Sequence, residues 1–212
     1  MSELEEIGEN LIEGQADKVR ELTQAAVDKG IGIEKILDDG LIAGMMVVGE
    51  RFKRKEIYLP EVLFSARAMK AGMEVLEPLL LSAGAKLKGK VILGTVQGDV
   101  HDIGKNLVAI MLKGAGFEVI DLGVSVSPQQ FIDAAKEQGA RLVGMSALLG
   151  TSMPMMQTTI EAFEAAGLKG QIKTMIGGAI VTQSYADKIG ADGYAPDAAS
   201  GVDKAKELLG LS

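Results

Sequence analysis

The chain has 212 residues, of which 47% are hydrophobic and 24% are charged, and its formal net charge is −7. This acidic balance argues against nucleic acid or an anionic membrane surface as the main partner, because both are bound through clustered Lys and Arg. Cysteine is absent, which excludes disulfides, thiolate catalysis, zinc–cysteine sites and iron–sulfur clusters held by this chain.

The start of the chain gives no sign of export. Residues 1–6 are acidic and polar, unlike the basic and apolar regions of a secretory signal. The longest apolar stretch, near residues 41–49, is too short to span a bilayer. We therefore expect a cytoplasmic protein without membrane association.

The first part of the chain, residues 1–84, carries helical periodicity only. Apolar residues recur three and four positions apart, and short breaks at Gly14, Gly30–Gly32 and 57–60 divide them into four segments. The four segments cover residues 4–11, 19–26, 33–55 and 62–80. Helices with such short connections predict a small antiparallel four-helix bundle.

The pattern changes at residue 90, after a linker at 85–89. Apolar runs rich in β-branched residues now alternate with amphipathic segments. The expected strands are 91–96, 117–122, 142–148, 172–176 and a weak one near 193–195. The expected helices lie near 104–115, 128–138, 154–166, 182–189 and 198–209. Residues 90–212 are therefore predicted to form a flavodoxin-like (Rossmann-like), doubly wound, five-stranded parallel sheet in the order 2-1-3-4-5.

The most informative stretch, residues 98–106, follows the first predicted strand and precedes its helix. It holds His101, the only histidine of the chain, between Asp99 and Asp102. A lone histidine is by default a structural or surface residue. At a strand–loop–helix junction, however, an imidazole beside carboxylates has the makings of a metal ligand with a hydrogen-bonding partner.

A second loop should meet this one. Ligands in open α/β sheets bind outside the carboxyl ends of the strands, where the strand order reverses. In the predicted order this point lies between strands 1 and 3. The loop after strand 3, residues 147–153, carries the hydroxyl groups of Thr151 and Ser152. The two loops are therefore expected to bring imidazole, carboxylate and hydroxyl groups into one crevice.

Two other interpretations of the histidine loop fit less well. A phosphate-binding P-loop needs Ser or Thr after its Gly-Lys pair, whereas Asn106 follows Gly104-Lys105, and the spacing is one residue too long. A Ser-His-Asp hydrolase of the α/β type needs a Gly-x-Ser-x-Gly elbow, which the sequence does not contain.

Three spaced elements carry a resemblance to a known family. In chain order they are Asp99-x-His101-x-x-Gly104, Ser146-x-Leu148 and Gly177-Gly178. Together they resemble the cobalamin-binding signature of corrinoid proteins, which bind their cofactor with the nucleotide tail displaced. The helical part is similar, at Phe52, 59–62 and 66–69, to the cap domain that precedes this module. The closest resemblance is to the small methyl-carrying proteins of anaerobic methyltransferase systems, with a further likeness to methionine synthase.

The resemblance implies a cofactor and its ligand. The cofactor would be cobalamin or a related corrinoid, as methylcobalamin or hydroxocobalamin, bound base-off with His101 as the axial cobalt ligand. Asp99 would accept a hydrogen bond from the other ring nitrogen, and Ser152 would bond to that carboxylate. Ser152 has a second interpretation, as a helix cap before Pro154. The full set of implied cofactor-binding residues is Gly98, Asp99, Val100, His101, Asp102, Ile103, Gly104, Ser146, Leu148, Thr151, Ser152, Gly177, Gly178, Phe52 and Leu59.

The resemblance also assigns roles around the nucleotide tail. Gly104 would let the loop turn tightly against the corrin. Gly177-Gly178 would leave room for the tail, and Ser146 and Leu148 would line the same channel. Gly94, midway along the first strand, suggests a close approach by the tail as well.

The implied function is methyl transport by a protein that is not catalytic alone. A substrate-specific methyltransferase would load the corrinoid, and a second methyltransferase would pass the methyl group to tetrahydrofolate or a thiol cofactor. A reductive activase would rescue oxidised cobalt. Phe52 and Leu59 would shield the corrin from above, although both also suit the bundle core. The methyl donor stays open among methylamines, betaines, methanol and methoxylated aromatics.

Three alternatives remain. The cobalamin subunit of an isomerase shares the histidine loop but usually lacks the helical cap. A cobalamin-binding sensor or regulator needs an appended DNA-binding or signalling domain, and the acidic charge weighs against it. A fragment of methionine synthase is disfavoured because the chain reads as a cap and a cobalamin module with natural ends.

Overall fold

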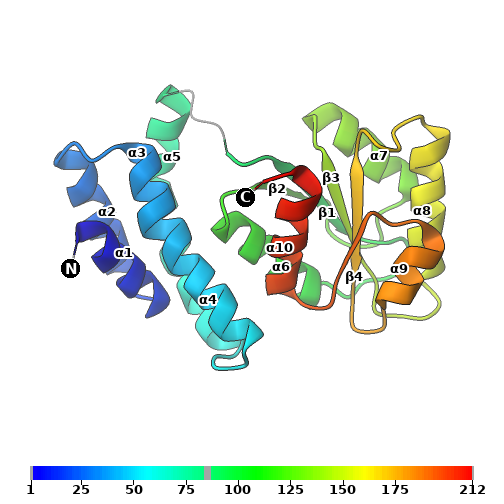
Figure 1. Ribbon diagram of the computed structural model, residues 1–212, viewed down its shortest axis with the longest axis horizontal. Coiled ribbons are helices and arrows are strands. Elements are labelled where there is room, and N and C mark those ends of the chain that lie inside the picture. Colours follow the sequence, from blue (N-terminus) through cyan, green and yellow to red (C-terminus); the bar gives the residue numbers. More distant parts are fainter. Residues whose placement is uncertain (1, 84–86, 212) are drawn as a thin grey trace. The chain divides into compact units, whose positions relative to one another are not determined.

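The computed structural model describes residues 2–83 and 87–211 (Figure 1). The chain divides into two compact units, Met1–Leu87 with Gly114–Gly116, and Lys88–Lys113 with Phe117–Ser212. We call them the helical unit and the sheet unit. Part of the predicted linker, residues 85–89, lies outside the described residues. Among those described, no helix combines the length and the apolar character needed to cross a membrane.

The helical unit contains the four predicted helices between residues 2 and 83. Ser2 begins the first of them with a capping box, in which its Oγ accepts a hydrogen bond from the Glu5 N–H. The elements are α1 (Glu3–Ile12), α2 (Ala16–Asp28), α3 (Ile33–Lys35), η1 (Ile36–Ile42), α4 (Ala43–Lys53) and α5 (Leu59–Ala83). The prediction of a helical N-terminal part is confirmed.

The third predicted helix, over 33–55, is not a regular α-helix. Its segment Ile36–Ile42 is π-helical, which places three consecutive residues, Gly40–Ile42, in the interior. A regular α-helix presents a narrower buried stripe, so the wider turn accommodates them. Beyond this segment, α4 approaches α1 closely: a Cβ on Gly44 would lie 2.9 Å from the carbonyl oxygen of Gly8.

A buried hydroxyl in α2 offers a test of the packing of the helical unit. Thr23 is fully buried, and its Oγ1 has no hydrogen-bond partner among the described residues. Leaving a buried polar group unsatisfied costs about 1–3 kcal/mol. We therefore expect Thr23→Val, which keeps the shape of the side chain, to raise the free energy of unfolding by about 1 kcal/mol.

Equilibrium urea unfolding of the apoprotein measures this change. Thr159→Val is the matched control, because Thr159 is equally buried but its Oγ1 donates to the Met155 carbonyl at 2.7 Å. The control is expected to be neutral or destabilising. If Thr23→Val lowered the midpoint as much as Thr159→Val, the hydroxyl of Thr23 would have a partner in solution.

In the sheet unit, as far as residues 87–211 describe it, five parallel strands form one sheet in the order β2-β1-β3-β4-β5. They are β1 (Lys90–Thr95), β2 (Glu118–Asp121), β3 (Leu142–Ser146), β4 (Lys173–Gly177) and β5 (Gly193–Ala195). The helices are α6 (Ile103–Gly114), α7 (Pro128–Gln138), α8 (Pro154–Ala165), α9 (Gln183–Ile189) and α10 (Ala198–Leu209). Helices α6 and α10 cover one face, and α7, α8 and α9 cover the other (Figure 1). The predicted fold class and strand order are confirmed.

The two faces of β1 explain the position of Gly94. Successive side chains of a strand point to opposite faces of the sheet. A Cβ on Gly94 would lie 2.7 Å from Cζ of Phe131 on α7, so this glycine makes room for a core aromatic ring. The expectation that Gly94 faces a bound tail is therefore wrong, because the cavity of the sheet unit lies on the face of its neighbour Leu93.

Asp192 ties β4 to the start of β5. Its Oδ2 accepts hydrogen bonds from the Thr174 N–H at 2.9 Å and the Thr174 hydroxyl at 3.1 Å, and Lys173 Nζ donates to Oδ1 at 2.9 Å. Burial by itself raises the pKa of the Asp192 carboxyl, but these hydrogen bonds and the charge of Lys173 hold its pKa below the ordinary value. The carboxylate form is therefore favoured by folding.

A carboxyl with a depressed pKa in the folded state stabilises the fold above its unfolded pKa of about 3.9, and this stabilisation is lost as the pH falls through the folded pKa. We expect Asp192→Asn to lower the free energy of unfolding by about 1 kcal/mol at pH 7, and by progressively less below about pH 4. Denaturant unfolding of both proteins between pH 7 and acid measures the difference. A difference that stays constant with pH would contradict this assignment.

Candidate functional site

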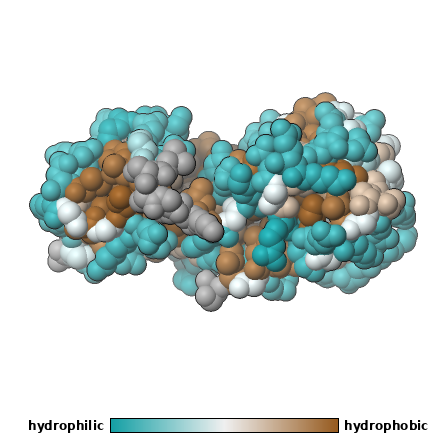
Figure 2. All heavy atoms as spheres, turned by 90° about the horizontal axis from the view of Figure 1, so that it is seen from above, coloured by the Kyte–Doolittle hydropathy of each residue, from teal (hydrophilic) through white to brown (hydrophobic). Residues whose placement is uncertain are grey.

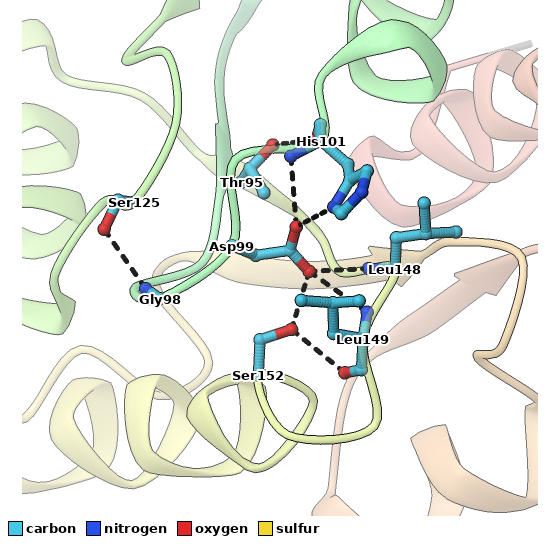
Figure 3. A network of polar contacts seen from close by, with 8 residues as sticks. All are labelled: Thr95, Gly98, Asp99, His101, Ser125, Leu148, Leu149 and Ser152. Atoms are coloured by element: carbon cyan, nitrogen blue, oxygen red, sulfur yellow. Dashed lines mark hydrogen bonds and ion pairs between the residues drawn. The ribbon is translucent and has the colours of Figure 1, made fainter.

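The loops that follow β1 and β3 meet at the C-terminal edge of the sheet (Figure 3). The first loop begins with a tight turn, in which the Asp99 N–H donates to the Val96 carbonyl at 3.1 Å. Gly98 occupies this turn with a φ of 83°, a left-handed conformation that favours glycine. The turn directs the Asp99 side chain inward and brings His101 to the edge of the sheet.

His101 and Asp99 form a close pair. The Nδ1 atom of His101 lies 2.7 Å from Asp99 Oδ1, and the same oxygen accepts the His101 main-chain N–H at 3.1 Å. The Asp99 side chain is fully buried, whereas 46% of the His101 side chain is exposed. Because an ionised carboxylate only accepts hydrogen bonds, this contact favours the neutral tautomer in which Nδ1 carries the proton and Nε2 keeps its lone pair.

The second oxygen of Asp99 is held by the loop after β3. Oδ2 accepts hydrogen bonds from Leu148 N–H at 2.8 Å, Leu149 N–H at 3.2 Å and Ser152 Oγ at 2.6 Å. Ser152 does not cap the next helix, because the N-cap of α8 is Met153 and no side chain caps it. The hydroxyl of Ser152 therefore serves the carboxylate, as Figure 3 shows.

These contacts fix the charge of the site. Burial by itself raises the pKa of the Asp99 carboxyl, but hydrogen bonds from Ser152, from the Leu148 N–H and from the imidazole hold its pKa far below the ordinary range. Asp99 is therefore ionised at neutral pH. The structure brings His101, Asp99 and Ser152 into one hydrogen-bonded chain that ends in an exposed imidazole edge.

A cavity of about 260 Å³ lies in the sheet unit. Its walls come from the carboxyl ends of β3, β4 and β5 and from helices α6 and α10, and most of its lining is apolar. Of the residues expected to hold a nucleotide tail, Ser146, Gly177 and Gly178 line this cavity, and Gly104 of the histidine loop lines it with them. Leu148 does not line it. β3 ends at Ser146, so Leu148 belongs to the following loop, where its N–H serves Asp99.

The glycines around the cavity have different structural reasons. Gly178 is required by the chain itself, since its φ is 139° and a Cβ would lie 2.0 Å from the Ala147 carbonyl oxygen. Gly104 is the second residue of α6, and no described atom lies within 4 Å of the place of its Cβ. Gly104 thus lies in the helix that follows the loop, next to open space. Its close approach to a corrin stays a prediction.

Apolar side chains stand exposed around His101. On the face drawn in Figure 2, apolar groups lie scattered between hydrophilic ones, which is normal for a protein surface. Around His101, by contrast, the two loops and the first residue of α6 expose two pairs of large apolar side chains, each pair close together in the sequence, namely Val100 and Ile103, and Leu148 and Leu149. Such a group beside a polar site marks a ligand or a partner. Leu149 was not predicted from the sequence as part of the site, although the apolar pair that it forms with Leu148, just after a strand, is a signal of an exposed apolar contact.

The remaining predicted residues lie outside the hydrogen-bonded chain of His101, Asp99 and Ser152. Asp102 is exposed, and its Oδ2 accepts a hydrogen bond from Asn106 Nδ2 at 3.0 Å rather than from the imidazole. Thr151 is exposed in the loop of Ser152. Phe52 in the last turn of α4 and Leu59 at the start of α5 are half-buried at one end of the helical unit.

Comparison with known proteins identifies relatives along nearly the whole chain. The B12 binding domain family matches residues 89–203, and a second family of the same description matches residues 3–77. A corrinoid protein of Desulfitobacterium hafniense is 42% identical, with 99% of each chain covered. Dimethylamine corrinoid protein 1 of Methanosarcina acetivorans is 48% identical, with 87% of this chain and 89% of the relative covered.

Solved structures agree with these sequence matches. The crystal structure of the methanol:cobalamin methyltransferase complex from Methanosarcina barkeri has a TM-score of 0.85 at 32% identity, covering 97% of this chain and 79% of that one. A cobalamin-binding protein from Desulfitobacterium hafniense has a TM-score of 0.80 at 31% identity, covering 97% and 98%.

Proposed function

The chain belongs to the family of B12-binding corrinoid proteins, and from this membership we propose that it carries methyl groups in a methylamine- or methanol-type methyltransferase system. A substrate-specific methyltransferase loads it, and a second methyltransferase passes the methyl group to tetrahydrofolate or a thiol cofactor. A reductive activase restores the oxidised protein. The chain acts in the cytoplasm and is not catalytic alone.

The observation that carries this proposal is the half-exposed imidazole of His101. Its Nδ1 is hydrogen-bonded to the buried Asp99 carboxylate at 2.7 Å, so Nε2 is the ring nitrogen left to ligate a metal. Imidazole nitrogen is a suitable ligand for a transition metal, and a carboxylate on the other ring nitrogen orients the ring and raises its basicity. His101 would thus hold the cobalt of a corrinoid bound in the proposed base-off, His-on state.

The residues present fit a corrinoid in three ways. The exposed apolar side chains of Val100 and Ile103 offer a surface to a large, mainly apolar ring. Gly104 lines the cavity, and no described atom lies within 4 Å of the place of its Cβ, so this space suits the displaced nucleotide tail. The Ser146 hydroxyl on its wall is available to contact the base of that tail.

A bound corrinoid would supply the cobalt atom that accepts and releases the methyl group. The chain supplies the groups that orient His101. Asp99 keeps the proton on Nδ1 of His101, and the Ser152 hydroxyl and two backbone N–H groups keep Asp99 ionised. Since these donors are fixed by the fold, the ring needs no rearrangement of solvent to act as a ligand.

The helical unit is proposed to act as a cap. Phe52 and Leu59 at one end of this unit would cover the reactive face and exclude water from it. A methyltransferase reaches that face only if the cap moves away, and the segment 85–89 is the proposed hinge. We expect a disulfide engineered between the units to abolish methyl transfer while the corrinoid stays bound. Transfer at the uncrosslinked rate would contradict a moving cap.

The proposal is tested by anaerobic reconstitution of the apoprotein with hydroxocobalamin. We expect one corrinoid per chain. When a substrate-specific methyltransferase and its labelled methylated donor are added, we expect labelled methyl bound to the protein. Dimethylamine is the first donor to test, because a relative 48% identical to this chain is a dimethylamine corrinoid protein. If the protein bound corrinoid but accepted no methyl group from any methylated donor, a cobalamin-binding regulator would be the better interpretation. If no corrinoid bound, the whole proposal would fall.

A further inference from the structure

The last residue of β2 and the segment after it, residues 121–126, run beside the histidine loop and are hydrogen-bonded to β1. The Thr95 N–H donates to the Gly123 carbonyl at 3.0 Å, and the Val126 N–H donates to the Thr95 carbonyl at 2.9 Å. We call residues 121–126 the β2 extension. None of its residues belongs to the three sequence elements that resemble the cobalamin-binding signature.

Ser125 of the β2 extension contacts the histidine loop on its N-terminal side. Its N–H donates to the Asp99 carbonyl at 2.9 Å, and its Oγ accepts the Gly98 N–H at 3.1 Å (Figure 3). Ser125 does so with a φ of 53°, a left-handed conformation that costs a residue with a Cβ about 1 kcal/mol. Backbone strain of this kind persists where the surrounding contacts outweigh it, and it clusters at functional sites.

Lys105 connects the β2 extension to the C-terminal side of the same loop. Its side chain is buried in the first turn of α6, and Nζ lies 2.7 and 2.5 Å from the two carboxylate oxygens of Asp121. The same Nζ donates to Asn106 Oδ1 at 2.6 Å, and Asn106 Nδ2 donates to Asp102 Oδ2 at 3.0 Å. A continuous polar chain thus runs from Asp121 to the residue that follows His101.

The β2 extension is therefore hydrogen-bonded to the histidine loop on both sides of His101, directly at residues 98–99 and through Lys105 and Asn106 at residue 102. Its contacts are to the backbone before His101 and, through Lys105 and Asn106, to the residue after it. Among the described residues, neither Ser125 nor Lys105 forms a hydrogen bond with the imidazole. We infer, on the basis of the proposed function, that Ser125 and Lys105 are positioning residues. They hold the histidine loop in the position in which His101 can ligate cobalt.

Two variants of the reconstituted protein test this inference. Ser125→Gly removes the acceptor of the Gly98 N–H but relieves the left-handed strain, so the fold is retained. Lys105→Met keeps an unbranched side chain, one atom shorter, and removes its charge. In each, we expect one corrinoid per chain as in the wild type, while the ratio of histidine-ligated to histidine-free cobalt(II), read by electron paramagnetic resonance, falls about tenfold.

The controls are Ser184→Gly on α9 and Lys136→Met on α7, which are exposed and lie outside the β2 extension and the histidine loop. Both should match the wild type. A purely structural role of Ser125 and Lys105 would lower the unfolding temperature without moving the ratio at full occupancy.

The outcomes separate this inference from the proposed function. Variants that keep the wild-type ratio, or that lose the corrinoid altogether, overturn the positioning role only. A wild type without histidine ligation overturns the proposed function and this inference with it. If Lys105→Met does not fold, Ser125→Gly decides alone, and Lys105→Arg, which keeps the charge, should recover the wild-type ratio.

Discussion

Gly201→Leu is expected to abolish corrinoid binding without unfolding the protein. Gly201 on α10 lines the cavity of the sheet unit, and a Cβ there would lie 3.6 Å from Val108 Cγ1 and 3.8 Å from Ala195 Cβ, which is ordinary contact. The first carbon of a new side chain therefore fits, and the remaining atoms of leucine enter the space proposed for the nucleotide tail. We expect the affinity for hydroxocobalamin to fall by at least about 100-fold, or about 2.7 kcal/mol.

The control for this prediction is Gly201→Ala. Alanine adds only the carbon that fits, and it favours an α-helix over glycine by about 0.5–1 kcal/mol. The alanine variant is expected to bind corrinoid and to unfold at a slightly higher temperature. Titration of both apoproteins, followed by the absorbance of bound corrinoid, measures the difference. Wild-type affinity in the leucine variant would show that the tail lies elsewhere.

Asp99→Asn is expected to damage both stability and ligation. The buried carboxylate accepts five hydrogen bonds from described residues, two from His101 and one each from Leu148, Leu149 and Ser152. An amide has a single oxygen acceptor, so its NH2 group would face donors in the interior. We expect the free energy of unfolding to fall by about 3 kcal/mol. The imidazole would also lose the partner that fixes its tautomer.

Asp102→Asn is the matched control in the same loop. Asp102 is exposed, and its carboxylate accepts one hydrogen bond from a described residue, Asn106 Nδ2 at 3.0 Å. The free energy of unfolding of the variant should therefore lie within about 0.5 kcal/mol of the wild type. Urea unfolding of the apoproteins and the spectrum of the reconstituted proteins measure the two effects. Equal behaviour of the two asparagine variants would contradict the assignment of Asp99 as the partner of the ligand.

Much of the fold could be predicted because its physical causes are local. The change from a helical to a strand–helix pattern at residue 90 follows from the spacing of apolar residues, and the strand order follows from short right-handed connections. The π-helical segment Ile36–Ile42 could not be predicted, since Ile36 and Leu41 are compatible with either helix type. Tertiary packing, not local spacing, decides between the two.

The site could be predicted as a set of residues but not as a set of contacts. His101 and Asp99 lie two positions apart, so their pairing was within reach of the sequence. The N–H groups of Leu148 and Leu149 and the brace by Ser125 were not, because they depend on where three loops meet. Gly94 shows the same limit: a glycine in a strand signals a close neighbour, but not which face that neighbour occupies.

The presence of one histidine in the whole chain allows the central claim to be tested directly. Protein made with 15N-histidine and reconstituted with unlabelled cobalamin is reduced to cobalt(II) and examined by electron paramagnetic resonance. If His101 is the axial ligand, the three-line splitting by 14N in unlabelled protein becomes a two-line splitting by 15N. A three-line pattern that persists after labelling, or a spectrum without nitrogen splitting, would contradict the account.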